Sequence, residues 1–215
     1  MAKSKIAALL VASVACGATA AHAQDSDRWF VKAGPAMVTQ DENATFTMGG
    51  APVPGANIKI NPTYTIEAQV GYFVTNNVAI AFTGGLPPTA RVHGDGTVAA
   101  LGTLGQAVFG PMTLTARYQF NRQGRFQPYV GAGAAMLVIF KTKDGAVSDL
   151  KAKNDVGEAV EAGADYWITP NTGVYVDAKQ TWLKTTTTGF LFGAPVVGKV
   201  RLNPEAYSVG VVHRF

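Results

Sequence analysis

The feature that most constrains this chain is a strict two-residue alternation from residue 59 to residue 72. Every even position there is apolar, and every odd position is polar or Gly, with Glu67 at the centre. Successive side chains of a β-strand point to opposite faces, so this pattern predicts a strand with one apolar and one polar face. The run is far longer than the roughly 5–6 residues usual for strands in soluble proteins.

The alternation recurs in seven other segments, at 29–37, 78–86, 112–121, 126–140, 155–168, 174–182 and 207–215. Tight turns are predicted at 74–77, 122–125 and 170–172. Long connections rich in Gly, Thr and charge are predicted at 39–57, 87–109, 142–154 and 185–198. An even number of strands with alternating short and long connections is typical of outer-membrane barrels, in which the short turns face the periplasm.

Backbone hydrogen bonding supports the membrane interpretation. In hydrocarbon every N–H and C=O must be paired within the protein, so only helices or closed barrels can span a bilayer. Beyond the N-terminus no apolar stretch approaches the ~18 residues of a spanning helix. We therefore predict an all-β fold, an eight-stranded antiparallel transmembrane β-barrel with its apolar face on lipid. A secreted β-sandwich or lipocalin-like barrel is the alternative, which strand length and the asymmetry of the connections disfavour.

Aromatic residues near the predicted strand ends fit this orientation, because barrels carry aromatic girdles at both membrane interfaces. These residues are Tyr64, Tyr72, Phe73, Tyr118, Phe120, Phe126, Tyr166, Trp182 and Phe215.

The N-terminus predicts export. Lys3 and Lys5 precede a short apolar run, and small residues end at Ala23, which is the pattern of a signal peptide over residues 1–23. Residues 24–215 would then form the barrel in the outer membrane of a Gram-negative bacterium, after export through the inner membrane. The only cysteine, Cys16, would leave with the signal. A lipid-modified Cys16 is the alternative, and Ser13 argues against it, because an aliphatic residue is expected three positions earlier.

Charge and histidine content argue against two function classes. The net charge is +4 and falls to +2 without Lys3 and Lys5, and charges of both signs are scattered, so nucleic-acid binding is not expected. His93 and His213 fall at opposite ends of the predicted barrel, so they cannot build a catalytic triad or a two-histidine metal site. We predict no enzyme activity, cofactor or metal, and interpret Asp144, Asp149 and Asp155 as solvated loop charges.

One local conflict predicts an irregularity. Val200 and Leu202 are apolar at even positions, whereas from Tyr207 onward the apolar positions are odd. A one-residue change of phase requires a bulge, which we place near Pro204 because proline cannot donate to a strand ladder.

Several motifs together resemble the OmpW family over essentially the whole mature chain. They are Tyr118-x-Phe120, Phe126-x-Pro128-Tyr129-Val130-Gly131-Ala132-Gly133, residues 162–166, Leu202-x-Pro204-x-x-Tyr207-Ser208-x-Gly210, and the terminal Arg214-Phe215. His213 departs from the family, which more often has Tyr there. The resemblance implies an eight-stranded barrel with a narrow channel for small hydrophobic molecules such as alkanes, with sideways exit into the bilayer. It also implies outer-membrane lipid as a partner and recognition of Phe215 by the outer-membrane assembly machinery. We expect a monomer.

The inward face carries the functional question, because eight strands leave room only for side chains or one small ligand. Inward polar and aromatic positions are Glu67, Arg117, Tyr129, Glu161, Asp165, Trp167, Tyr175, Asp177 and Lys179. Apolar inward positions are Leu137, Ile139, Trp167 and Leu183, mostly toward the outer half. The charged set is either a paired plug, since unpaired buried charge is costly, or a gate.

The transport candidates are Glu67, Arg117, Tyr129, Leu137, Ile139, Asp165, Trp167, Asp177, Lys179 and Leu183. We hypothesise an apolar funnel above a charged floor, with lateral release. The predicted function is porin-like passive uptake of small hydrophobic molecules. The alternative is a structural or adhesive barrel with a plugged lumen, whose extracellular loops bind a partner.

Overall fold

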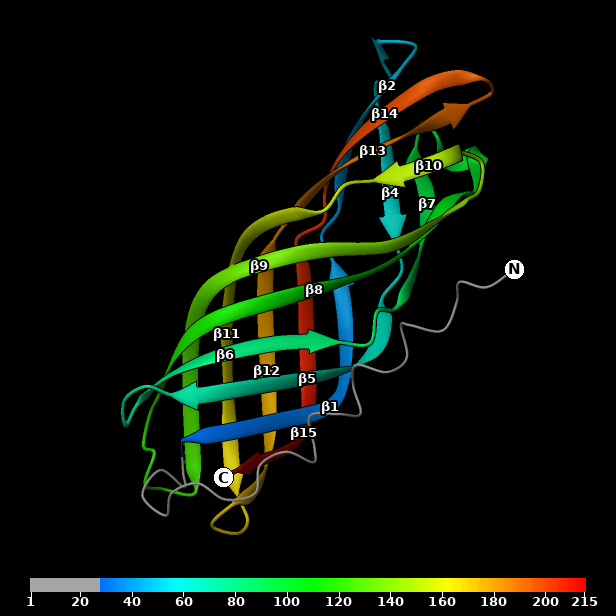
Figure 1. Cartoon of the computed structure of the whole chain (residues 1–215). Helices are drawn as coiled ribbons and strands as arrows, with labels where there is room; N and C mark the ends of the chain where they lie inside the picture. The colour runs from blue at the N-terminus through cyan, green and yellow to red at the C-terminus, as the bar shows by residue number, and fades with distance from the viewer. Residues whose placement is uncertain (1–27) are drawn as a thin grey trace, which may run out of the picture.

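The computed structural model describes residues 28–215, which form a closed antiparallel barrel extended at one end by further strands (Figure 1). The barrel strands are β1 (Trp29–Gln40), β5 (Thr63–Phe73), β6 (Val78–Gly85), β8 (Thr103–Gln119), β9 (Phe126–Asp144), β11 (Asp155–Trp167), β12 (Thr172–Trp182) and β15 (Pro204–Arg214). Their spatial order is β8-β6-β5-β1-β15-β12-β11-β9, and pairing of β8 with β9 closes the ring. The eight-stranded barrel is confirmed, whereas the predicted signal peptide lies outside the described residues.

The long connections are themselves ordered strands, which the prediction of loops missed. They hold β2 (Asn43–Met48), β3 (Ala51–Pro52), β4 (Ala56–Ile60), β7 (Thr89–Gly96), β10 (Ser148–Ala152), β13 (Lys184–Leu191), β14 (Ala194–Arg201) and the short 3-10 helix η1 (Ala99–Leu101). β10, β13, β14, β2 and β3 form a second sheet, while β4 and β7 continue the wall above β8. Threonine-rich sequence favours strands, and Gly49, Gly50 and Gly193 adopt the positive φ that tight hairpins require.

The short turns lie together at one end, at the bottom of Figure 1 beside the C-terminus. Turns 74–77 and 122–125 connect β5 to β6 and β8 to β9, as predicted. The predicted change of phase near Pro204 is wrong, because even positions stay inward from β14 through β15: Val200, Leu202, Pro204, Ser208 and Val212 are all buried. Val200 and Leu202 are apolar because they pack inside the molecule, and the register of β15 runs on without a bulge. Within residues 28–215, no helix is long and apolar enough to cross a membrane. By the usual orientation of such barrels, the short-turn end faces the periplasm.

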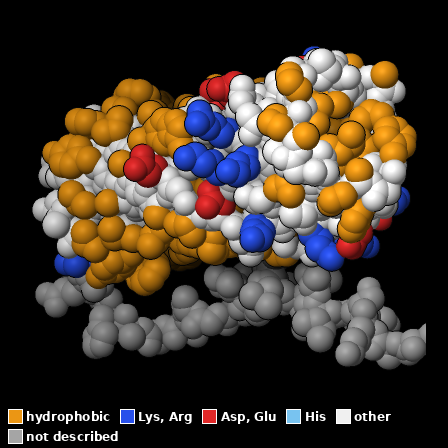
Figure 2. Space-filling view, turned by 90° about the horizontal axis from the view of Figure 1, so that it is seen from above, with side chains coloured by type: hydrophobic (Ala, Val, Ile, Leu, Met, Phe, Trp, Pro, Cys, Tyr) orange, Lys and Arg blue, Asp and Glu red, His pale blue; other side chains and the backbone are white. Residues whose placement is uncertain are grey.

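Apolar side chains cover the outside of the barrel and form the orange band of Figure 2. Alternate residues of each strand, such as Ile66, Leu114 and Val209, are exposed on this wall, while their neighbours point into the lumen. A soluble barrel would bury these residues instead. The predicted assignment of the two faces is therefore confirmed for the barrel strands.

Two details of that assignment were wrong. Residues 59–72 are not one strand, because β4 ends at Ile60 and β5 begins at Thr63. Pro62 lies between them and has no N–H for a ladder, so the phase changes there: Ile60 is buried inward and Lys59 is exposed. Phe73 also points inward, where its ring centroid lies 5.4 Å from that of Phe30, so it is not part of the girdle.

Candidate functional site

The lumen is filled by three layers that differ in chemistry. The outermost layer is an apolar chamber, the middle layer is a network of ionised and amide side chains, and the periplasmic layer is aromatic. Because each strand contributes alternate residues to the interior, every layer collects side chains from several strands. A solute that crossed the whole lumen would have to displace all three.

The apolar chamber has a volume of about 90 Å³ and lies between the barrel and the second sheet. Its walls include Ile58, Ile60, Phe109, Leu137, Ile139 and Leu202, and none of the residues that line it is charged. Four threonines are its only residues with polar side chains. Such a surface offers contact to an apolar molecule and little compensation for a desolvated polar one.

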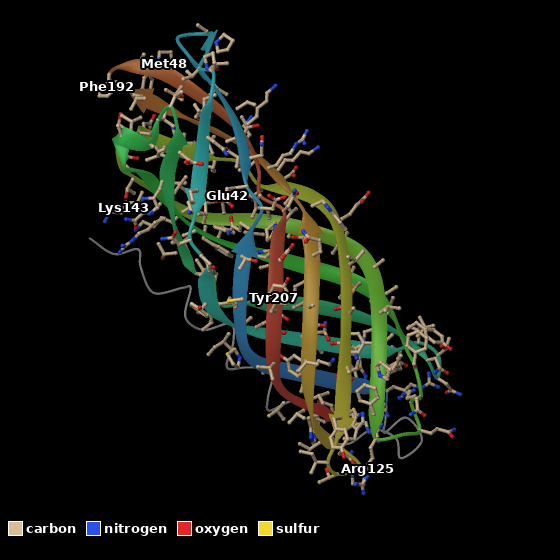
Figure 3. All side chains as sticks on the ribbon, turned by 180° about the vertical axis from the view of Figure 1, so that it is seen from behind. Glu42, Met48, Arg125, Lys143, Phe192 and Tyr207 are labelled. Atoms are coloured by element: carbon tan, nitrogen blue, oxygen red, sulfur yellow. The ribbon has the colours of Figure 1, made fainter. Side chains whose placement is uncertain are left out.

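The chamber continues toward the outer tip into a second apolar hollow of about 270 Å³. Phe46 and Leu104 line both spaces, and Met48 and Phe192 line the outer one. Figure 3 shows Met48 and Phe192 at the far end from the short turns, on neighbouring hairpins. Apolar side chains therefore line the molecule from the far tip to the chamber.

Lys179 organises one half of the charged network. Its Nζ lies 3.0 Å from Glu67 Oε1 and 3.7 Å from Glu161 Oε2, and it also bonds Asp177 Oδ1. Tyr129 donates its hydroxyl to the other oxygen of Asp177 at 2.5 Å. All three carboxylates thus lie around one cation, and the removal of that cation would leave them without their ammonium partner.

Asp165 organises the other half. Lys32 Nζ donates to its Oδ1 at 2.6 Å, and Arg117 and Gln119 approach its Oδ2 at 3.4 and 3.1 Å. The Arg117 guanidinium also lies 4.1 Å from the Tyr129 ring centroid, so the two halves are in contact. Across both halves, three cations face four carboxylates. The predicted pairing of Arg117 and Lys179 with inward carboxylates is confirmed.

Two glycines of the family motifs make room for this network. A Cβ at Gly163 would lie 2.4 Å from Tyr129 Oη, and one at Gly131 would lie 2.9 Å from Glu161 Oε1. Neither position has space for a methyl group without displacing a charged or hydrogen-bonded partner. Both glycines therefore allow a close approach between neighbouring groups on the inner wall of the barrel.

Aromatic side chains close the periplasmic end of the lumen, below the charged network. Phe30 and Phe73 form one buried cluster, and Trp167 and Tyr175 belong to another. Arg122 lies over the Phe73 ring at 3.7 Å, and Arg214 lies over the Trp167 ring at 4.3 Å. Trp167 is thus at the periplasmic end, whereas the sequence had grouped it with residues mostly in the outer half.

The structure places the sequence-predicted residues in separate layers. Glu67, Arg117, Tyr129, Asp165, Asp177 and Lys179 meet in the network, Leu137 and Ile139 line the chamber, Leu183 packs in the same apolar cluster, and Trp167 lies in the periplasmic aromatic layer. Sequence reasoning missed Lys32, Gln69 and Gln119, although each occupies the polar face of an alternating segment. It also missed the chamber residues Val92 and Val196, because they fall in segments predicted as loops, and it assigned the chamber residue Ile60 to the lipid face.

The barrel wall has a weak seam beside the chamber. β6 pairs with β8 as far as Thr83 and Thr113, and β7 resumes the pairing at Thr89 and Val108. In between lie Pro87 and Pro88, which have no N–H to donate. A hollow of about 400 Å³ opens there, lined by Tyr64, Thr65, Ile66, Leu86, Pro87 and Pro88.

Phe109 and Pro88 lie between this hollow and the chamber. Across the gap, the Phe109 N–H donates to the Pro88 carbonyl at 3.4 Å. Phe109 lines the chamber and Pro88 lines the outer hollow.

The acidic loop residues and histidines do not build a second site in the described part of the chain. No group of His, Cys, Asp or Glu side chains within residues 28–215 is arranged to hold a metal ion. Asp144 accepts the N–H groups of Asp149 and Leu150, so it organises its loop. His93 and His213 are half-buried rather than fully exposed, beside threonine hydroxyls.

Comparison with known proteins identifies similar chains. The model of the OmpW family matches residues 25–215. Over 224 residues the chain is 30% identical to outer membrane protein W of Escherichia coli, covering 100% of each chain. It is 27% identical to the dibenzothiophene metabolism operon protein PahQ of Pseudomonas aeruginosa, covering 96% of this chain and 97% of PahQ.

A solved structure agrees with these relatives. The solid-state NMR structure of outer membrane protein AlkL in DMPC lipid bilayers has a TM-score of 0.71 at 28% identity, covering 93% of this chain and 94% of that one. AlkL of Ectopseudomonas oleovorans is 29% identical over 175 residues, which is 81% of this chain and 76% of AlkL. The relatives are outer-membrane proteins, so the predicted location is confirmed.

Proposed function

This chain belongs to the OmpW family, and we propose that it is a passive channel for uptake of small hydrophobic molecules across the outer membrane. The observation that carries the proposal is the uncharged chamber of about 90 Å³, together with the second apolar hollow toward the outer tip. A chamber without charged groups suits apolar solutes, because polar ones would lose hydration without compensation. The name of PahQ refers to a dibenzothiophene metabolism operon and supports the same class of solute.

The route below the chamber turns sideways in this proposal. Entering the charged network would force an apolar solute to separate ion pairs such as Lys179 and Asp177, which are costly to break. The seam at Pro87 and Pro88 requires only that Phe109 and a proline segment move. We therefore assign the charged network a structural role as the floor, and the seam the role of exit into the bilayer.

The chamber is tested by filling it. Ala107 lines the chamber, so Ala107→Trp places an indole in its volume. Cells or liposomes that carry this variant should take up a fluorescent apolar solute at least about tenfold more slowly than wild type. Ala134→Trp is the matched control, because Ala134 lies on the exposed lipid face of β9. Equal uptake by wild type and both variants would refute the chamber as the conduit.

The floor is tested by Lys179→Trp, which fills the network layer while leaving the chamber open. Lateral release predicts that its uptake stays at the wild-type rate. A loss as large as that of Ala107→Trp would assign the route to the floor and overturn the sideways exit. Folding of each variant is checked by the mobility shift of the heated and unheated barrel in gel electrophoresis.

The seam is tested by a reversible staple. Leu86 lies just after β6 and beside Pro87, and its N–H donates to the carbonyl of Ile66 on β5 at 3.0 Å. Both residues are exposed, so a covalent link between them would hold the proline segment against β5. Cysteines at both positions should form a disulfide that slows uptake, and a reducing agent should restore it. The control pair is Val176→Cys with Val209→Cys, in direct register on the opposite wall. Slowing by the control staple, or none by the seam staple, would contradict the exit.

A second candidate function is a structural or adhesive barrel. The observation that favours it is the filled lumen, together with Phe192, which is 86% exposed at an extracellular hairpin tip. Deleting residues 190–195 should then abolish partner binding, while Ala107→Trp would have no effect. The channel proposal predicts that uptake depends on Ala107→Trp whether or not the tip binds a partner.

A further inference from the structure

Four basic side chains cluster on the outer surface where the second sheet begins. Lys184 on β13 lies directly opposite Arg201 on β14. Two residues further along the same pair of strands, away from the barrel, Thr186 lies opposite Lys199. Lys153 N–H donates to the carbonyl of Thr186 at 3.2 Å, so Lys153 borders this second pair. The neighbouring residues Leu183 and Val200 are buried inward, so these four side chains point outward and are exposed.

This arrangement is unfavourable by itself. Side chains directly opposite on an antiparallel pair are about 5 Å apart at Cβ, and like charges there destabilise the sheet. None of the four forms an ion pair with another described residue. Two carboxylates, Glu158 and Glu205, lie on the membrane side of the cluster, in register with Trp182 and Gln180 on β12. Asp155 also lies beside the cluster, because its Oδ2 accepts the Lys184 N–H at 2.8 Å. Carboxylates therefore border the cluster, but none of its four basic side chains is held in a direct ion pair within the described part of the chain.

Its height relative to the membrane indicates what neutralises it. Trp182 precedes Lys184 by two residues on the same outward face and is exposed to lipid. Tryptophan marks the level of the membrane interface, so the basic side chains stand at the level of the headgroups. On the face seen in Figure 2, Lys and Arg side chains gather where the apolar band ends, with carboxylates beside them.

We propose that Lys153, Lys184, Lys199 and Arg201 form a binding site for the phosphate groups of outer-leaflet glycolipid, lipid A. A phosphomonoester carries up to two charges and several acceptor oxygens, which match clustered ammonium and guanidinium donors. Headgroup phosphate offsets the repulsion between Lys184 and Arg201. The site lies on the outside of the wall and does not depend on solute uptake.

The test titrates the folded, detergent-solubilised chain with diphosphorylated lipid A and measures binding by native mass spectrometry. Each basic residue near a lipid surface contributes about fivefold in affinity, so Lys184→Gln with Arg201→Gln should weaken binding by about 30-fold. The matched control, Lys141→Gln with Lys143→Gln, removes the same charge from exposed positions on β9. It should leave the affinity unchanged.

Three outcomes would overturn the proposal: unchanged affinity in the Lys184/Arg201 variant, equal losses in both variants, or equal wild-type affinity for lipid A lacking its phosphates. A stability measurement guards against misfolding of the variant. Without lipid A, removing the like-charge pair should raise the unfolding temperature in zwitterionic detergent. A variant that is both less stable and weaker in binding would assign these residues to the fold instead.

Discussion

Replacing Lys179 with Met should destabilise the barrel strongly while keeping its side-chain volume. Lys179 is the shared partner of Glu67, Glu161 and Asp177, with Nζ at 3.0 Å from Glu67 and 3.7 Å from Glu161. The side chains of Lys179, Glu161 and Asp177 are 5% exposed or less. Removing one partner of a buried ion pair costs about 3–5 kcal/mol, because the charge that remains has no compensation. We expect a loss of that size in the free energy of unfolding.

The assay is equilibrium unfolding in urea from phosphatidylcholine vesicles, followed by tryptophan fluorescence. Lys179→Met with Glu67→Gln removes one carboxylate together with the cation and should recover more than half of the loss. Lys143→Met, at an exposed loop-proximal position, should change stability by no more than about 0.5 kcal/mol. A loss below about 1 kcal/mol for Lys179→Met, or no recovery in the double variant, would refute the view that the network is a compensated plug.

Three further predictions concern the lumen wall, a hairpin tip and a loop. Gly163→Ala should lower the free energy of unfolding by about 1–3 kcal/mol in the same urea assay, because its Cβ would lie 2.4 Å from Tyr129 Oη. An unchanged urea midpoint would contradict this packing argument. Phe192→Asn should stabilise the fold by about 1 kcal/mol, since Phe192 has φ of 52° in a tight turn and asparagine tolerates this conformation; thermal unfolding at or below the wild-type temperature would contradict it. The N–H groups of Leu150 and Asp149 hold the pKa of Asp144 below its ordinary value of 3.8. The ionised carboxylate should therefore keep the loop ordered at pH values above 3.8. That order should be lost as the pH falls through the lowered pKa and the carboxylate is protonated. Hydrogen-exchange protection of those two amides should follow that course and should be absent in Asp144→Ala at every pH, because alanine has no side-chain acceptor.

The sequence by itself determined which solvent meets each face of the barrel. Alternation is a local property of a strand, so Leu114 and Arg117 could be assigned to lipid and lumen without knowing their neighbours. Strand number, turn positions and the inward charged set followed from the same rule. The resemblance to a family rested on Tyr129, Gly131 and Gly163, which the structure shows to be packed around the network.

Only the tertiary structure decided how the inward residues are divided among layers. Whether Lys179 contacts Glu67 depends on the register between β12 and a strand more than a hundred residues away, which no local pattern encodes. The same holds for the chamber, which is built from connections that pair as strands across the second sheet. The alternation at 59–72 likewise gave no sign of the break at Pro62, which separates two strands. The side chain of Ile60 therefore points inward, whereas that of Ile66 is exposed on the lipid face.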